Sequence, residues 1–257
     1  MSNSKMPVIF IGHGSPMNAV EENEYSQAWR EVGKQLPRPK GILSISAHWE
    51  TLTPQVTAMK QPETIHDFYG FPRELNEMIY PAPGSPDLAE KVLQLMHEKN
   101  SGPSMDWGLD HGTWSVLARM FPKADVPVVQ LSLARTRDGQ YHYDLGKQLL
   151  SLRDEGILVL GSGNIVHNLR MMRFDNQPYD WTVEFDAQIK QWIDAGKHEP
   201  MIHFQEQGKS AAYAINSAEH YLPLLYVLAL QTKQDDLRYF CETTSYGSLS
   251  MRCVQFG

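Results

Sequence analysis

The sequence has few cysteines, no excess of positive charge and no long apolar segment. Its 257 residues include two cysteines, Cys241 and Cys253, which are too few for a disulfide framework and do not form a CxxC pair. No window approaches the roughly 18 consecutive apolar residues of a transmembrane helix. The formal net charge of −7 argues against nucleic acid or an anionic membrane surface as the main partner. We therefore expect no nucleic acid and no membrane among its partners.

The N-terminus also lacks the features of a secretory signal. The first ten residues, MSNSKMPVIF, lead directly into a strand-like segment, without an apolar core or a small-residue cleavage site. We expect a cytoplasmic protein with reduced thiols. Nothing in the sequence specifies an oligomeric state.

Short β-branched apolar runs alternate with helical patterns along the first two thirds of the chain. The runs predict buried strands at 7–12, 41–47, 126–133 and 157–161, and a further strand at 55–59 that pairs with the second. The intervening segments predict helices at 22–36, 86–98, 112–121 and 139–155. This alternation is typical of an α/β sheet covered by helices on both faces.

The C-terminal third has a different pattern. It predicts helices at 183–194 and 219–231, followed by a closing antiparallel pair of strands at 237–243 and 248–256. The chain contains no internal repeat, low-complexity tract or Gly/Ser linker. We therefore expect one α/β domain over residues 1–257, with a central, mostly parallel or mixed β-sheet flanked by helices.

Three of the ten histidines occupy equivalent places in this pattern. His13 follows the first strand in IFIGHGSPM, His48 follows the second in ILSISAHWE, and His167 follows a third in ILVLGSGNIVHNL. A single histidine beyond a strand end is often only a loop residue. Three of them beyond the ends of strands in one sheet indicate a metal site, acid/base chemistry, or both, at one end of the sheet.

Two more histidines are candidates for the same site. His220, in SAEHYLPLLYVLAL, begins an apolar helix beside Glu219, and only one of these neighbours is expected to face the site. His111, in GLDHGTW, precedes another helix, for which Asp110 is the expected cap. His97, His142, His198 and His203 lie in polar or helical stretches and are expected at the surface.

Several aromatic and basic residues leave alternatives open. The loop ETIHDFYGFP, which contains His66, either covers a pocket or merely packs. Trp49 and Trp114 either form an aromatic wall beside the histidines or belong to the core. Arg119, Arg170 and Arg173 either bind a substrate carboxylate or are solvated surface charges.

Familiar nucleophile and nucleotide motifs are missing. The sequence contains no GxSxG, HExxH or Walker motif, and GSGN at 161–164 is not a dinucleotide fingerprint. Ser15, near His13, has no evident orienting acid. A metal site is therefore a stronger hypothesis than a serine hydrolase.

Taken together and in order, the segments GHGSPMN, SAHW, GLDHGTW, GNIVHNL and EHYLPLLY resemble the 4,5-DOPA extradiol dioxygenase family. This family belongs to the class III, LigB-like extradiol ring-cleavage dioxygenases, and the resemblance extends to the GSLSM segment near the C-terminus. It implies a single α/β catalytic domain with a mononuclear non-haem Fe(II). It also implies a catechol (DOPA-like) substrate that is cleaved with O2 to a muconic semialdehyde-type product.

The resemblance also implies roles for individual residues. It places the metal ligands at His13, His48 and His220 and the catalytic acid/base at His167, and it implies a further catalytic role near the pocket for His111, either in contact with the substrate or behind the residues that are. Many class III members have a glutamate as third ligand, so Glu219 is the alternative to His220. Three imidazoles also suit Zn(II), which is therefore possible as the bound metal in isolated protein. The alternative functions are a zinc-dependent hydrolase that uses the same histidines and a non-catalytic metal-binding protein.

Overall fold

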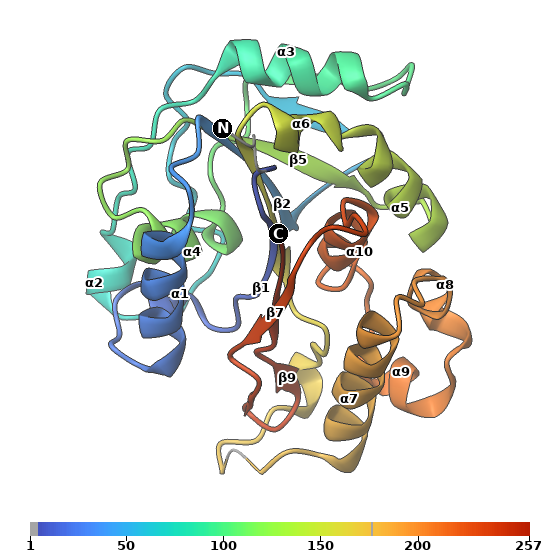
Figure 1. Cartoon of the computed structure of the whole chain (residues 1–257). Helices are drawn as coiled ribbons and strands as arrows, with labels where there is room; N and C mark the ends of the chain where they lie inside the picture. Colours follow the sequence, from blue (N-terminus) through green and yellow to red (C-terminus); the bar gives the residue numbers. More distant parts are fainter. Residues whose placement is uncertain (1–4, 176) are drawn as a thin grey trace.

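The computed structural model, which describes residues 5–175 and 177–257, has a mixed eight-stranded sheet at its centre (Figure 1). The strand order is β4-β3-β5-β2-β6-β1-β10-β7. The strands of this sheet are β1 (Val8–Gly12), β2 (Gly41–Thr51), β3 (Gln55–Thr57), β4 (Gly102–Ser104), β5 (Val128–Ala134), β6 (Ile157–Gly163), β7 (Leu237–Phe240) and β10 (Cys253–Phe256). A separate short pair consists of β8 (Thr244–Ser245) and β9 (Leu249–Ser250).

The four central strands, β5, β2, β6 and β1, run parallel, and their side chains are buried on both faces except at His48, Glu50 and Thr51 near the end of β2. In β1, Val8 and Phe10 enter one apolar cluster, whereas Ile9 and Ile11 enter another on the opposite face. Burial on both faces explains why these strands are continuous apolar runs in the sequence. The expected α/β sheet with helices on both faces is therefore confirmed.

The helices divide between the two faces of this sheet (Figure 1). On one face lie α1 (Glu24–Gln35) and α4 (His111–Met120), and on the other lie α5 (Gly139–Gln148) and α10 (Leu222–Ala229). The remaining α-helices are α2 (Arg73–Asn76), α3 (Pro86–Leu95), α6 (Ser151–Asp154), α7 (Asp180–Asp194), α8 (Glu199–Ile202) and α9 (Gly208–Ala214). Within the described part of the chain, three 3-10 helices complete the set: η1 (Pro16–Ala19), η2 (Leu169–Met171) and η3 (Phe204–Glu206).

Several expected elements differ in detail. The strand at β3 pairs with β5 and β4, not with the second strand as expected. The helix expected over 139–155 is divided into α5 and α6.

His142, expected at the surface, lies on α5 and is fully buried against α10, where its Nδ1 lies 3.0 Å from the Tyr226 hydroxyl. The closing pair is confirmed, because β10 runs antiparallel to β7, with Cys253 opposite Phe240.

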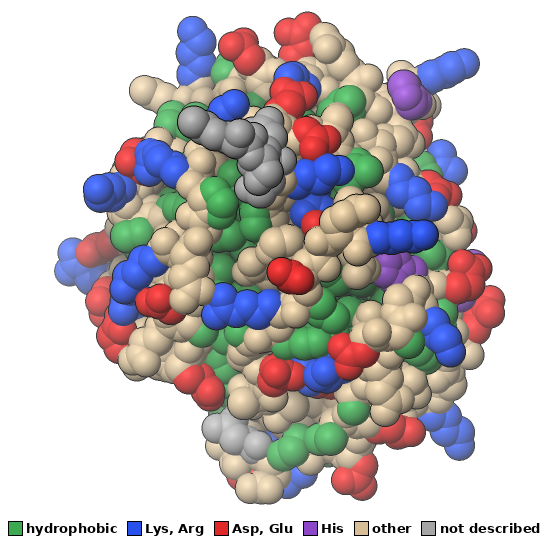
Figure 2. Space-filling view, in the orientation of Figure 1, with side chains coloured by type: hydrophobic (Ala, Val, Ile, Leu, Met, Phe, Trp, Pro, Cys, Tyr) green, Lys and Arg blue, Asp and Glu red, His purple; other side chains and the backbone are tan. Residues whose placement is uncertain are grey.

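Charged side chains of both signs occur on the surface of the molecule. On the face drawn in Figure 2, basic and acidic side chains are interspersed and form no broad patch of one sign. Among the described residues, no helix is both long enough and apolar enough to span a bilayer.

Candidate metal centre

The five histidines singled out in the sequence line one cavity of about 460 Å³. Because β2, β6 and β1 are parallel neighbours, their carboxyl ends meet at one edge of the sheet. His13 directly follows β1 and His167 follows β6 by four residues. His48 was expected after its strand but lies inside β2, which continues to Thr51 past an irregularity in its pairing with β5. The cavity therefore opens at the end of the sheet where the sequence predicts a site.

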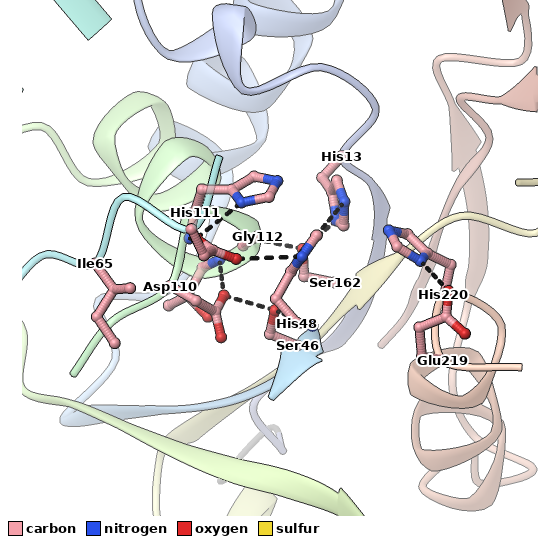
Figure 3. Close-up of polar contacts among 12 residues, drawn as sticks. His13, Ser46, His48, Ile65, Asp110, His111, Gly112, Ser162, Glu219 and His220 are labelled. Carbon is pink, nitrogen blue, oxygen red and sulfur yellow. Dashed lines mark hydrogen bonds and ion pairs between the residues drawn. The ribbon is translucent and has the colours of Figure 1, made fainter. Parts of the chain in front are cut away.

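The ring of His13 is held by a short chain of hydrogen bonds (Figure 3). Ser162 Oγ donates to the carbonyl oxygen of Gly112 at 2.5 Å, so it accepts from Nδ1 of His13 at 3.0 Å. This arrangement puts the ring proton on Nδ1 and leaves the lone pair of Nε2 free. The next residue, Gly14, has a φ of 57°, a conformation that glycine adopts without strain.

His220 is oriented in the same manner, by a hydrogen bond to a carboxylate, and His48 has a carboxylate beside its Nδ1. Asp67 Oδ2 lies 3.3 Å from His48 Nδ1, and Glu219 Oε1 lies 3.0 Å from His220 Nδ1. Each carboxylate favours the tautomer with a proton on Nδ1, so that Nε2 remains a free acceptor. His220 lies two residues before α10, where its backbone approaches β6 closely. A Cβ atom on Gly163 would lie 2.0 Å from the His220 carbonyl oxygen.

The donor set formed by His13, His48 and His220 fits a transition-metal ion. One ring nitrogen from each lies within 4.8 Å of the others. The Nε2 atoms of His13 and His48 are 3.2 Å apart, so two lone pairs face each other. Two nitrogens bound to one tetrahedral ion at about 2.0–2.1 Å would be separated by roughly 3.3 Å. A cation between these rings would relieve the lone-pair repulsion.

His167 lies beside this donor set. Its ring stacks on that of His220, with centroids 3.4 Å apart and planes 6° apart. Its backbone N–H donates to the Ala214 carbonyl at 2.9 Å. No side-chain hydrogen bond joins its ring nitrogens to another described residue, and the ring lines the cavity. His167, Glu219 and His220 also place one donor atom each within 4.8 Å, so geometry alone leaves a ligand role open for His167 and Glu219.

His111 is the first residue of α4, which Asp110 caps by accepting the Thr113 N–H, as expected. Its ring packs at 3.8 Å, centroid to centroid, from that of His48. Asp67 Oδ1 accepts the backbone N–H of His111 at 2.9 Å and lies equally close to its ring Nδ1. The latter contact lacks hydrogen-bond alignment, so the buried Nδ1 has no well-directed partner among the described residues.

Electrostatics favour neutral imidazoles at four of these histidines. Burial, reinforced by the neighbouring histidines, holds the pKa of His13 and of His220 well below the ordinary value. Burial also lowers the pKa of His48 to about 3 and that of His167 to about 4. Burial by itself raises the pKa of Asp67, but its contacts with His111 and His48 outweigh this effect and lower it. Neutral imidazole is the form that binds metal ions.

Asp67 belongs to the site although no motif in the sequence points to it. It belongs to the loop ETIHDFYGFP, which contributes Asp67, Phe68 and Phe71 to the cavity lining. His66 of the same loop packs away from the cavity, with Nε2 2.9 Å from the Met78 carbonyl oxygen. An aspartate directly after a histidine in an aromatic, proline-flanked loop was the available signal.

The aromatic wall of the cavity differs from the one considered in the sequence. Trp49 and Trp114 are 4% and 0% exposed and belong to the core. The aromatic residues that line the cavity are instead Phe68, Phe71, Phe174 and Tyr246.

Comparisons with known proteins give a consistent result. A family model described as the catalytic LigB subunit of aromatic ring-opening dioxygenase matches residues 6–248. The 4,5-DOPA dioxygenase extradiol of Escherichia coli K12 is 43% identical over 100% of this chain and 97% of its own length. Its namesake from Beta vulgaris is 38% identical over 84% of this chain and 83% of its own. A crystal structure of an uncharacterized Escherichia coli K12 protein, 38% identical, has a TM-score of 0.83 and covers 98% of this chain and 100% of that one. The similarity thus includes every segment that contributes to the histidine cluster.

Proposed function

The chain belongs to the LigB family of aromatic ring-opening dioxygenases, and from this premise we propose how its histidine cluster cleaves a catechol. The protein is an oxidoreductase of the extradiol dioxygenase type. Our proposal is that His13, His48 and His220 hold one Fe(II) ion, that His167 is the acid/base, and that the product is a muconic semialdehyde. The substrates are then O2 and a small-molecule catechol.

The observation that supports this proposal best is that each of the three ligand candidates has a polar partner at Nδ1, through a hydrogen bond at His13 and His220 and through a carboxylate contact at His48. Ser162, Asp67 and Glu219 each engage an Nδ1 atom, which leaves three Nε2 lone pairs for one ion. Glu219 then has the role of orienting His220, not of binding the metal itself. When bound, Fe(II) would supply open coordination positions and an electron for dioxygen, whereas Zn(II) would supply charge alone.

The protein residues have separate tasks in ring cleavage. His167 has ring nitrogens without hydrogen bonds to the described residues, so it is free to accept a proton from a catechol hydroxyl and to return it later. His111 also lines the cavity, where its ring packs beside that of His48, and it provides a second polar contact for the substrate. Phe68 packs edge to face on His111 with centroids 5.5 Å apart, which excludes water from that side of the ring-binding space.

Oxygen uptake tests the proposal and separates it from the zinc hydrolase. The protein is loaded anaerobically with Fe(II), or in parallel with Zn(II), and mixed with a panel of catechols in air-saturated buffer. We expect one O2 consumed per catechol and a yellow ring-opened product with Fe(II), and no uptake with Zn(II). No uptake by protein shown to contain iron would contradict the proposal and favour the hydrolase.

We also infer that residues 1–257 function as a single catalytic domain in the cytoplasm. Cell fractionation with an antibody to the untagged protein tests the location. Recovery in the periplasmic or membrane fraction would contradict it.

A further inference from the structure

The cavity lining combines the five histidines with many apolar side chains. Among the described residues of the lining, Asp67 is the one acidic residue, and it is engaged with His48 and His111. The lining also contains the apolar residues Phe68, Phe71, Leu169, Met172, Phe174 and Leu249, together with Ser15 and Tyr246. A catechol whose diol faces the histidines therefore directs its ring substituent toward aromatic and aliphatic side chains.

Two of these apolar residues are unusual in being exposed. Phe174 is 86% exposed and Leu169 is 55% exposed, although both line the cavity. Leu169 begins η2 and Met172 directly follows it, and both side chains line the cavity. An exposed apolar lining at a cavity is typical of a surface that a ligand covers.

No lysine or arginine lines the cavity among the described residues, and residues 1–4 and 176 contain neither type. The three arginines considered in the sequence have other places. Arg119 donates to the carbonyl oxygens of Asn18 and Glu21 and pairs with Glu22. Arg173 pairs with Asp175 at 2.8 Å and lies over the Tyr179 ring. Arg170 is exposed beside Leu169 but does not line the cavity.

This composition has a consequence for charged substituents. A carboxylate placed against these apolar side chains loses part of its hydration and gains no cationic partner, which disfavours binding. An alkyl group in the same place buries apolar surface on both sides and favours it. The excess of negative charge on the chain acts in the same direction on anionic substrates.

Building on the proposed ring cleavage, we propose that the cavity selects catechols with a neutral, apolar substituent over catechols with a carboxylate-bearing one. The diol and the ring supply recognition at the histidines, and the wall around Leu169, Met172 and Phe174 supplies recognition of the substituent. A catechol amino acid is then accepted through its ring, and its carboxylate weakens binding.

The test compares two catechols with side chains of the same shape. These are 4-(3-methylbutyl)catechol and 3-(3,4-dihydroxyphenyl)propanoate, and kcat/KM for each is measured by oxygen uptake with the Fe(II)-loaded protein. We expect kcat/KM to favour the alkyl catechol at least about tenfold. The preference should persist in 0.5 M NaCl, because local desolvation is screened far less than long-range repulsion. A preference that disappears in salt would contradict a role for the wall.

Two variants at η2 make the test specific. Leu169→Arg places a cation in the exposed part of the wall and should shift the ratio at least about fivefold toward the carboxylate. The matched variant Arg170→Leu removes a neighbouring cation outside the lining and should leave the ratio unchanged. If Arg170→Leu instead weakened cleavage of the carboxylate alone, Arg170 would be its partner and the proposal would be wrong.

The outcomes also distinguish this inference from the function on which it rests. Equal kcat/KM for the two catechols, or a preference for the carboxylate, would overturn the substituent preference and leave ring cleavage intact. Oxygen uptake with neither catechol would overturn ring cleavage itself and remove the inference with it.

Discussion

The imidazole rings of His167 and His220 stack face to face, with centroids 3.4 Å apart and planes only 6° apart. Their nearest polar contacts differ. His220 has its Nδ1 engaged by Glu219, whereas no described side chain forms a hydrogen bond to the His167 ring. The stack therefore places His167, a base without a side-chain hydrogen bond to the described residues, directly against His220, whose ring is oriented by Glu219. This relationship underlies the division of roles that we propose, with His220 on the metal and His167 acting on the substrate.

Replacing a ligand candidate should abolish metal binding. In His13→Ala or His48→Ala, two nitrogen donors remain, and we expect metal content below about a tenth of wild type by elemental analysis after dialysis. His66→Ala is the matched control, because His66 contacts a backbone carbonyl outside the cavity. Wild-type metal content in either ligand variant would place the site elsewhere.

Removing the charge of Asp67 should weaken the site without abolishing it. Asp67 approaches Nδ1 of both His48 and His111, so Asp67→Asn loosens the tautomer and orientation of both rings. We expect metal affinity to fall about ten- to hundredfold in a chelator competition assay. Asp175→Asn, at an exposed ion pair, serves as control. Unchanged affinity in Asp67→Asn would show that the carboxylate has no orienting role.

A methyl group on Gly163 should displace His220. The added Cβ would lie 2.0 Å from the His220 carbonyl oxygen, so the backbone that holds this ligand candidate must move. We expect Gly163→Ala to lower metal affinity by at least about tenfold. Gly102→Ala is the control, since a Cβ there meets no atom within 4 Å. If both variants bound metal like wild type, the β6–His220 contact would not position the site.

A buried ion pair far from the cavity should control acid stability. Arg153 is fully buried, donates to the Met6 and Leu230 carbonyls, and pairs with Asp235 at 2.7 Å. Removing its partner in Asp235→Asn leaves a buried charge unpaired, so we expect a loss of about 3–5 kcal/mol in the free energy of unfolding at pH 7. Asp154→Asn, in an exposed pair with Lys5, should cost less than about 1 kcal/mol.

The pH dependence of this loss has a defined sign. Burial by itself raises the pKa of Asp235, but the hydrogen bonds from Arg153 and the Thr232 N–H outweigh it and lower the pKa. The carboxylate therefore stabilises the fold above its unfolded pKa of about 3.9, and this contribution is lost as the pH falls through the folded value. In urea titrations, the difference between wild type and Asp235→Asn should shrink below pH 4. A constant difference down to pH 2 would contradict this account.

Much of this fold could be predicted because its signals are local. Apolar runs between Gly and Pro define the central strands, and Asp110 caps α4 as its sequence context indicates. Histidines after neighbouring parallel strands come together for topological reasons, which is how the sequence analysis found His13 and His167.

The remaining features depend on contacts that the sequence does not encode locally. The end of β2 depends on pairing with β5, so His48 lies within a strand that the sequence predicts to end at residue 47. The burial of His142 depends on the docking of α10 against α5. Asp67 joins the site because its loop folds over His48 and His111, two residues that lie far apart in the sequence.

The most direct test of our account is a paired measurement on His167→Ala. Metal content is determined after Fe(II) loading, and oxygen uptake with the best catechol is measured on the same sample. Our account predicts wild-type iron content together with a loss of turnover of at least about hundredfold. Loss of iron from His167→Ala would contradict it, because His167 would then be a ligand and the site would need a different base.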